Sequence, residues 1–149
     1  MKKWKYWIPV GVMLVFIWGN SLLNGTISEY LSSFIHMLFS GREQADIIAN
    51  GYDHILRKIA HFSEYFLLCC SVVYAWRHTL ENKKNYCPYT LLFLIVAPID
   101  EFIQLFVADR SGSFKDVLID WSGFILAFAL ISLWLNWRAT HKKVTHPSD

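Results

Sequence analysis

Ionisable side chains interrupt otherwise apolar stretches at three places along the sequence. His61 and Glu64 lie three residues apart, Asp100 and Glu101 are adjacent, and Asp120 lies near the start of a further apolar stretch. An imidazole that titrates near neutral pH, together with several carboxyl groups, is a set suited to general acid–base chemistry. His61, Glu64 and Glu101 are therefore the candidate catalytic residues if the protein is an enzyme.

Basic and hydrogen-bonding side chains flank these acids and have the chemistry to bind a ligand. Lys58, Arg110 and Lys115 can hold phosphate oxygens, because charged nitrogen donors form strong hydrogen bonds with phosphate. Spacings of three, four and seven residues place further polar side chains on the same helix faces as the acids. The candidate ligand-binding set is Lys58, Tyr65, Asp100, Gln104, Arg110, Lys115, Asp116 and Asp120.

A divalent cation is an alternative occupant of the acidic set. His61 and Glu64, three residues apart, with the carboxylates of Asp100, Glu101 and Asp120, would make an oxygen-rich site suited to Mg²⁺ or Ca²⁺. The basic residues near these positions in the motifs disfavour a cation there. We therefore assign no metal ligand and leave the cofactor undetermined, with a divalent metal as the minor alternative.

The composition indicates which environment must position these residues. Of the 149 residues, 54% are hydrophobic and 17% are charged, whereas soluble domains average about 25% charged residues. So much apolar surface does not fit inside the core of one domain of this size, and the bilayer is the expected solvent. The net charge of +2 gives no indication of nucleic-acid binding.

Four apolar stretches approach the roughly 20 residues that a spanning helix needs. They cover about 7–23, 56–76, 89–108 and 117–137 of a single domain, 1–149. The long segment between the first two has a capping-box pattern followed by apolar residues at helical spacing, which predicts a short amphipathic or re-entrant helix. The predicted fold class is an all-α membrane protein with four transmembrane helices and this extra short helix.

The basic residues are distributed in a way that predicts the orientation of the chain. Nine of the fourteen Lys and Arg residues flank the span ends that would share a side with the N-terminus, and these residues are enriched on the cytoplasmic side of membrane proteins. Both termini are therefore expected in the cytoplasm. With this topology the acids of the last three spans arrive at similar depth on the opposite side, where they would line a polar extracytoplasmic cavity.

The residues that carry this chemistry also carry a family resemblance. Four runs, at 58–65, 100–104, 110–116 and 120–123, read KIAHFSEY, DEFIQ, RSGSFKD and DWSG. In this order they resemble the VanZ-like family of small bacterial membrane proteins. The resemblance implies a multi-pass protein of the bacterial cell membrane, and the family's namesake is associated with low-level resistance to the lipoglycopeptide teicoplanin. It implies no biochemical activity.

Three functions remain open for this polar set. The favoured hypothesis is that the cavity binds a lipid head group or an amphiphile, and the resemblance adds teicoplanin resistance as a consequence. The alternative is an enzyme that acts on an outer-leaflet lipid or a lipid-linked cell-wall intermediate. The third is a structural network, which is disfavoured because three cations face five acids in the motifs and the surplus acids need partners. The expected partners are membrane lipids and an amphiphilic or lipid-linked ligand, with no nucleic acid.

Overall fold

The structure is a computed structural model of the whole chain, and every regular element among the residues it describes is helical. Those residues are 3–23, 27, 30, 34, 37, 52–81, 86–108, 110 and 112–145, and the side chains of 52–54 and 142–145 are not described. The elements are the 3-10 helix η1 (Lys3–Trp7), α1 (Ile8–Ser21), α4 (Tyr52–Thr79), α5 (Tyr86–Leu91), the 3-10 helix η2 (Leu92–Ile95), α6 (Val96–Gln104) and α7 (Phe114–Thr145).

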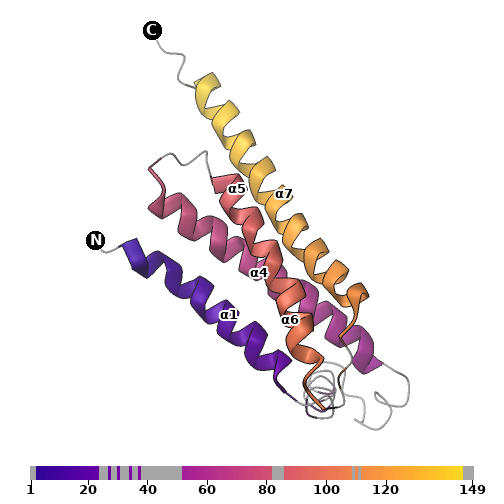
Figure 1. Cartoon of the computed structure of the whole chain (residues 1–149). Helices are drawn as coiled ribbons and strands as arrows, with labels where there is room; N and C mark the ends of the chain where they lie inside the picture. Colours follow the sequence, from indigo (N-terminus) through magenta and orange to yellow (C-terminus); the bar gives the residue numbers. More distant parts are fainter. Residues whose placement is uncertain are drawn as a thin grey trace.

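The helices form an elongated bundle in which α1, α4, the contiguous stretch α5–η2–α6 and α7 alternate in direction (Figure 1). We call the end where α6 turns into α7 the turn end, and the end where α1 begins and α7 ends the terminal end. The most extensive helix–helix interface lies between α4 and α7, while α1 packs on α4 and α6, and α6 packs on α7. The core between the helices includes the fully buried side chains of Ile17, Leu68, Val72 and Phe124.

Three helical segments in the described part of the chain are long and apolar enough to cross a membrane: Ile55–Thr79, Tyr86–Gln104 and Phe114–His141. Large apolar side chains also cover the outside of the bundle, with Phe106 76% exposed, Val15 74% and Leu133 66%. Apolar surface on this scale is unusual for a protein that faces water and fits one that faces lipid chains. The chain is therefore a membrane protein.

The helices α4 and α7 extend beyond the expected spans 56–76 and 117–137 at both ends, and the bounds of the other two stretches differ as well. The stretch expected over 89–108 begins at Tyr86 and stops at Gln104, because the N–H of Val107 donates back to the Gln104 carbonyl at 3.1 Å and closes a turn. The stretch expected over 7–23 contains α1, whose 14 residues are too few for a spanning α-helix by themselves. The predicted helix between the first two spans falls almost wholly outside the described residues, and the few described there are helical.

The segment Tyr86–Gln104 is not one continuous α-helix, and Pro98 leaves the carbonyl group of an earlier residue without an intrahelical donor. The segment runs through α5, η2 and α6. Because Pro98 has no N–H, the carbonyl of Leu94 four residues earlier lacks its usual α-helical donor. The indole N–H of Trp121 in α7 donates to this oxygen at 2.9 Å. This hydrogen bond connects the segment Tyr86–Gln104 to α7.

The backbones of α4 and α7 come into contact at Gly123. A Cβ added there would lie 3.0 Å from the carbonyl carbon of Phe62 and closer still to its oxygen. Glycine has no Cβ and therefore allows this close approach. Ala127, four residues further along α7, is fully buried. Two small residues thus lie on the face of α7 that packs most closely against its neighbours.

Candidate functional site

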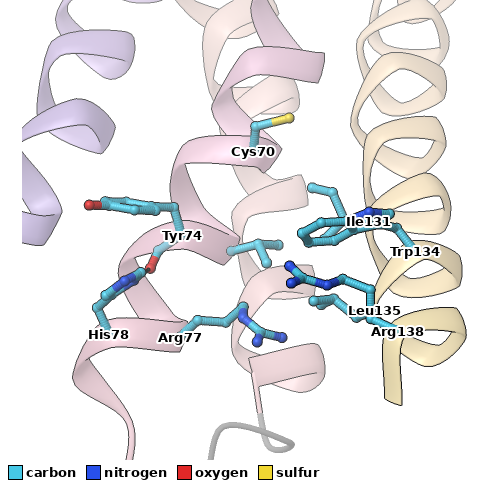
Figure 2. Close-up of a pocket in the computed structure, with 9 residues that line it drawn as sticks. Cys70, Tyr74, Arg77, His78, Ile131, Trp134, Leu135 and Arg138 are labelled. Carbon is cyan, nitrogen blue, oxygen red and sulfur yellow. Dashed lines mark hydrogen bonds between the residues drawn. The ribbon is translucent and has the colours of Figure 1, made fainter. Parts of the chain in front are cut away.

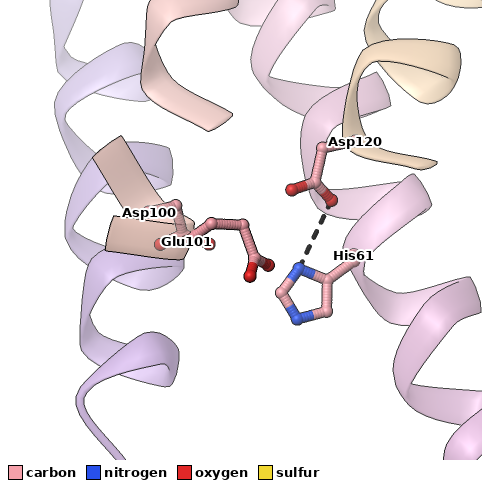
Figure 3. Close-up of side chains that lie close together, drawn as sticks. All are labelled: His61, Asp100, Glu101 and Asp120. Atoms are coloured by element: carbon pink, nitrogen blue, oxygen red, sulfur yellow. Dashed lines mark ion pairs between the residues drawn. The ribbon is translucent and has the colours of Figure 1, made fainter. Parts of the chain in front are cut away.

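Four acidic or imidazole side chains from three helices converge toward the turn end of the bundle (Figure 3). His61 comes from α4, Asp100 and Glu101 come from α6, and Asp120 comes from α7. Each offers a potential metal-ligand atom, and these atoms all lie within 4.8 Å of one another. Asp100 and Asp120 are 0% exposed, and His61 and Glu101 are 5% exposed. We call these four residues the carboxylate cluster.

Within the carboxylate cluster, His61 pairs with Asp120 across the α4–α7 interface. His61 Nδ1 lies 3.3 Å from Asp120 Oδ1, within ion-pair distance but without the geometry of a hydrogen bond. His61 Nδ1, both carboxylate oxygens of Asp120 and Glu101 Oε1 have no hydrogen-bond partner among the described residues. Buried polar atoms are nearly always hydrogen-bonded, so several unpartnered ones at a single place indicate a binding or reactive site. The arrangement suits acid–base chemistry or the binding of a cation.

Polar side chains at the end of α1 hold two of the buried acids. Ser21 Oγ donates to Asp100 Oδ1 at 2.5 Å, and Asn20 Nδ2 donates to Glu64 Oε1 at 3.1 Å. Gln104 Nε2 donates to Asp100 Oδ2 and to Ser21 Oγ, both at 3.3 Å. Asn20 and Ser21 were not expected from the sequence. The signal that would have indicated them is two adjacent polar residues near the end of an apolar stretch.

The loop before α7 holds the carboxylate of Glu101. The backbone N–H of Ser113 donates to Glu101 Oε2 at 2.7 Å. Ser113 also caps α7, because its Oγ accepts a hydrogen bond from the N–H of Lys115 at 3.2 Å. Gly112 allows the loop to come this close, since a Cβ there would lie 2.7 Å from the carbonyl oxygen of Glu101. The carboxylate therefore lies at the N-terminal end of α7, where the helix dipole favours a negative charge.

Arg110 is half-buried at the turn end, and its guanidinium contacts α1. Its Nη2 donates to the carbonyl oxygen of Asn20 at 3.1 Å, while Nε and Nη1 have no partner among the described residues. Burial lowers the pKa of Arg110, and the charge of Arg57 lowers this pKa as well, against the opposite effect of the buried acids. Arg57, which was not in the expected set, therefore lies near enough to act on the same site.

The expected site residues differ in how far the structure buries them. The buried group toward the turn end consists of His61, Glu64, Tyr65, Asp100, Glu101, Gln104 and Asp120. Arg110 and Asp116 are half-buried, whereas Lys58 and Lys115 are exposed. In the described part of the chain, neither lysine forms an ion pair with the carboxylate cluster. These two positive charges therefore do not neutralise the cluster.

A pocket of about 340 Å³ lies between α4 and α7 toward the terminal end (Figure 2). Its charged lining residues are the basic Arg77 and Arg138, with His78 beside them. The guanidinium of Arg138 lies 4.8 Å from the ring centroid of Trp134, which is within cation–π distance. The other lining residues are Cys70, Val73, Tyr74, Ile131 and Leu135. We call this feature the arginine pocket.

The comparison with known proteins confirms the family that the motifs resemble. No curated protein and no solved structure matches the chain. The family described as VanZ/LLP1 matches residues 6–135, a range that includes the whole carboxylate cluster. This match covers well over half of the 149 residues. The chain therefore belongs to the VanZ/LLP1 family.

Proposed function

We propose that this protein binds the anionic head group of a membrane lipid at the turn end of the bundle. The observation that supports this proposal best is Arg110, a half-buried guanidinium. Two of its nitrogen atoms have no partner among the residues that the structure describes, and the charge of Arg57 lies nearby. A phosphate group accepts paired hydrogen bonds from guanidinium nitrogens and offsets the repulsion between two such groups. Leu105 and Phe106, which are 59% and 76% exposed, add apolar surface at this end for acyl chains.

In this proposal, η1 and α1 together form a fourth transmembrane segment. Five residues of 3-10 helix and 14 residues of α-helix extend about 31 Å, close to the roughly 30 Å thickness of a bilayer hydrocarbon core. The outward face of α1 is apolar, as a lipid-facing helix requires, with Val12 61% and Phe16 59% exposed. Its buried face contacts α4 and α6.

The orientation proposed for the bundle places both termini in the cytoplasm of a bacterial cell. Lys3, Arg77 and Arg138 share the terminal end, where Lys3 Nζ donates to the carbonyl oxygen of Thr79 at 3.2 Å. Basic residues mark the cytoplasmic side of membrane proteins. The turn end then faces outward, where it meets lipids and acylated glycopeptides such as teicoplanin in the outer leaflet.

Lipid retention by single-charge variants tests this proposal. The full chain is placed in nanodiscs that contain phosphatidylglycerol, and the lipid that remains bound is counted by native mass spectrometry. Arg110→Gln is expected to weaken retention about tenfold or more, because a hydrogen bond to a charged group contributes about 1.5–3 kcal/mol and a tenfold change corresponds to about 1.4 kcal/mol. Arg57→Gln is expected to have a smaller effect in the same direction.

Lys115→Gln is the matched control, because it removes one positive charge from an exposed side chain at the same end. Equal losses in Arg110→Gln and Lys115→Gln would show general charge attraction and would contradict a specific site. Full retention of the lipid by Arg110→Gln would contradict the proposal as well. The proposed link to teicoplanin is tested by the minimum inhibitory concentration in cells that express the wild type or Arg110→Gln.

A second candidate function, an enzyme acting on a lipid head group or a lipid-linked cell-wall intermediate, is supported by the His61–Asp120 pair. A carboxylate 3.3 Å from an imidazole nitrogen is the arrangement of a general base with its orienting group. The purified protein is incubated with membrane lipids and cell-wall precursors, and products are sought by mass spectrometry. A product that His61→Gln abolishes supports the enzyme, whereas an unchanged co-purified lipid supports the binding protein.

A further inference from the structure

The carboxylate cluster has the donor atoms and the geometry of a metal site. One imidazole nitrogen and three carboxylate oxygens from α4, α6 and α7 lie within 4.8 Å of one another. Metal–ligand bonds of about 2.0–2.2 Å place the donors of a tetrahedral site about 3.4 Å apart and the opposed donors of a site with more ligands about 4.2 Å apart. Small movements of the four side chains would therefore bring all of these atoms into contact with a single central ion.

The free atoms of the cluster are the ones that a metal would need. His61 Nδ1, Glu101 Oε1 and both oxygens of Asp120 are buried and have no hydrogen-bond partner among the described residues. Each of these side chains is at least nine-tenths buried. In Figure 3, the side chains of His61, Glu101 and Asp120 point toward one another from different helices.

Two carboxylates of the cluster, Asp100 and Glu101, are held in place by neighbours, Asp100 through both of its oxygens. Asp100 accepts hydrogen bonds from Ser21 Oγ and Gln104 Nε2. Glu101 Oε2 accepts one from the N–H of Ser113, which leaves Oε1 free. Metal-binding carboxylates are characteristically oriented by such outer hydrogen bonds.

The charges of the cluster also favour a cation. Three carboxylates share this site with one imidazole, and the lysines expected to oppose them are exposed instead. Arg110 directs its Nη2 to the carbonyl of Asn20 on α1. A divalent ion would compensate most of the negative charge, and buried charges are stable when they are paired or coordinate a metal.

We propose that His61, Asp100, Glu101 and Asp120 bind one divalent transition-metal ion between α4, α6 and α7. Imidazole favours Zn²⁺ and its neighbours in the first transition row, while carboxylates also accept Mn²⁺. The mixed set therefore favours Zn²⁺ or Mn²⁺ over Mg²⁺ and Ca²⁺, which prefer oxygen ligands alone. The metal site does not depend on lipid binding at Arg110.

The first experiment uses the wild-type full chain in detergent. The protein is purified without chelators, its metal content is measured by mass spectrometry, and it is then stripped with EDTA and titrated with Zn²⁺, Mn²⁺ and Co²⁺. We expect about one ion per chain, visible absorption bands of bound Co²⁺ that Zn²⁺ displaces, and a higher melting temperature with metal. No saturable binding of any of the three ions would overturn the proposal.

Two substitutions and two controls assign the ligands. Asp120→Asn and His61→Gln keep the approximate shape of each side chain and are expected to weaken Zn²⁺ binding by about 100-fold or more, since loss of even an outer partner costs about 10–100-fold. Glu81→Gln, at an exposed acid just beyond the end of α4, and His78→Gln, on the same helix as His61, are the controls and should bind as the wild type does. Equal affinity in all five proteins would overturn the assignment. If a ligand variant fails to fold, the Co²⁺ spectrum and stoichiometry of the wild type decide the question.

Discussion

The two ends of the α4–α7 pair differ in the sign of their charged side chains and in whether those side chains are buried. Near the turn end, Gly123 allows the backbones to touch at Phe62, and the pair encloses His61 and Asp120 away from solvent and lipid. Toward the terminal end the same two helices leave the arginine pocket of about 340 Å³ between them. The same pair of helices thus produces a closed acidic site and an open basic one.

This contrast indicates that charged side chains are buried in this protein where neighbouring elements supply hydrogen-bond or ion-pair partners. Three of the four buried acids, Asp100, Glu64 and Glu101, receive hydrogen bonds from Ser21, Asn20 and the backbone of Ser113. The fourth, Asp120, lies 3.3 Å from the imidazole of His61. In the arginine pocket, Arg138 remains exposed and stacks on Trp134 instead. Burial without such partners would cost several kcal/mol per ion. Substitutions at the two ends should therefore have very different effects on stability.

The largest effect is expected from Gly123→Ala, which acts on the packing that closes the turn end. The added Cβ would overlap the carbonyl group of Phe62, and a backbone group moves only if the helices separate. We expect a loss of about 3 kcal/mol, at the upper end of overpacking effects. Thermal or SDS unfolding in detergent measures this loss. Gly19→Ala is the control, because a Cβ there meets no atom within 4 Å, and an equal loss in both variants would contradict the explanation.

A moderate effect is expected from Ser21→Ala, which removes a partner of a buried acid and leaves the helix packing intact. Its hydroxyl donates to Asp100, which is 0% exposed, and a lost hydrogen bond to a charged group costs about 1.5–3 kcal/mol. The same unfolding assay measures the loss. Ser63→Ala serves as the control, because the Ser63 hydroxyl is exposed and donates to the carbonyl of Ile59 on its own helix. A change in the free energy of unfolding of less than a few tenths of a kcal/mol in Ser21→Ala would mean that the hydrogen bond from Ser21 does not stabilise the buried Asp100.

The smallest effect is expected from Arg138→Gln in the arginine pocket. Its contact with the ring of Trp134 is an exposed cation–π interaction, which contributes about 0.5–1 kcal/mol. The free energy of unfolding should therefore fall by less than about 1 kcal/mol. If the free energy of unfolding fell as much in Arg138→Gln as in Ser21→Ala, the charged groups at the two ends would contribute equally to stability, which would contradict the contrast drawn between them.

Much of the fold and of the site could be predicted from the sequence, because the signals are strong. Long apolar stretches indicate membrane-crossing helices, and Asp100, Glu101 and Asp120 stand out because carboxylates are rare in such stretches. Asn20 and Ser21 were missed because uncharged polar residues near the end of an apolar stretch are common. Arg57 was missed because it lies at the start of its stretch, where a basic residue is ordinary.

The membrane environment and the acids within the apolar stretches could be predicted from composition and local spacing, because both depend only on neighbours in the chain, and the motifs indicated the family by resemblance. Only the three-dimensional fold shows that one ligand atom from each of three acids and His61 lies within 4.8 Å of the others, and that the side chains of Lys58 and Lys115 are exposed. Spacing places a residue on a face of its own helix. The distance and rotation between helices depend on contacts between residues far apart in the chain, such as Gly123 against Phe62.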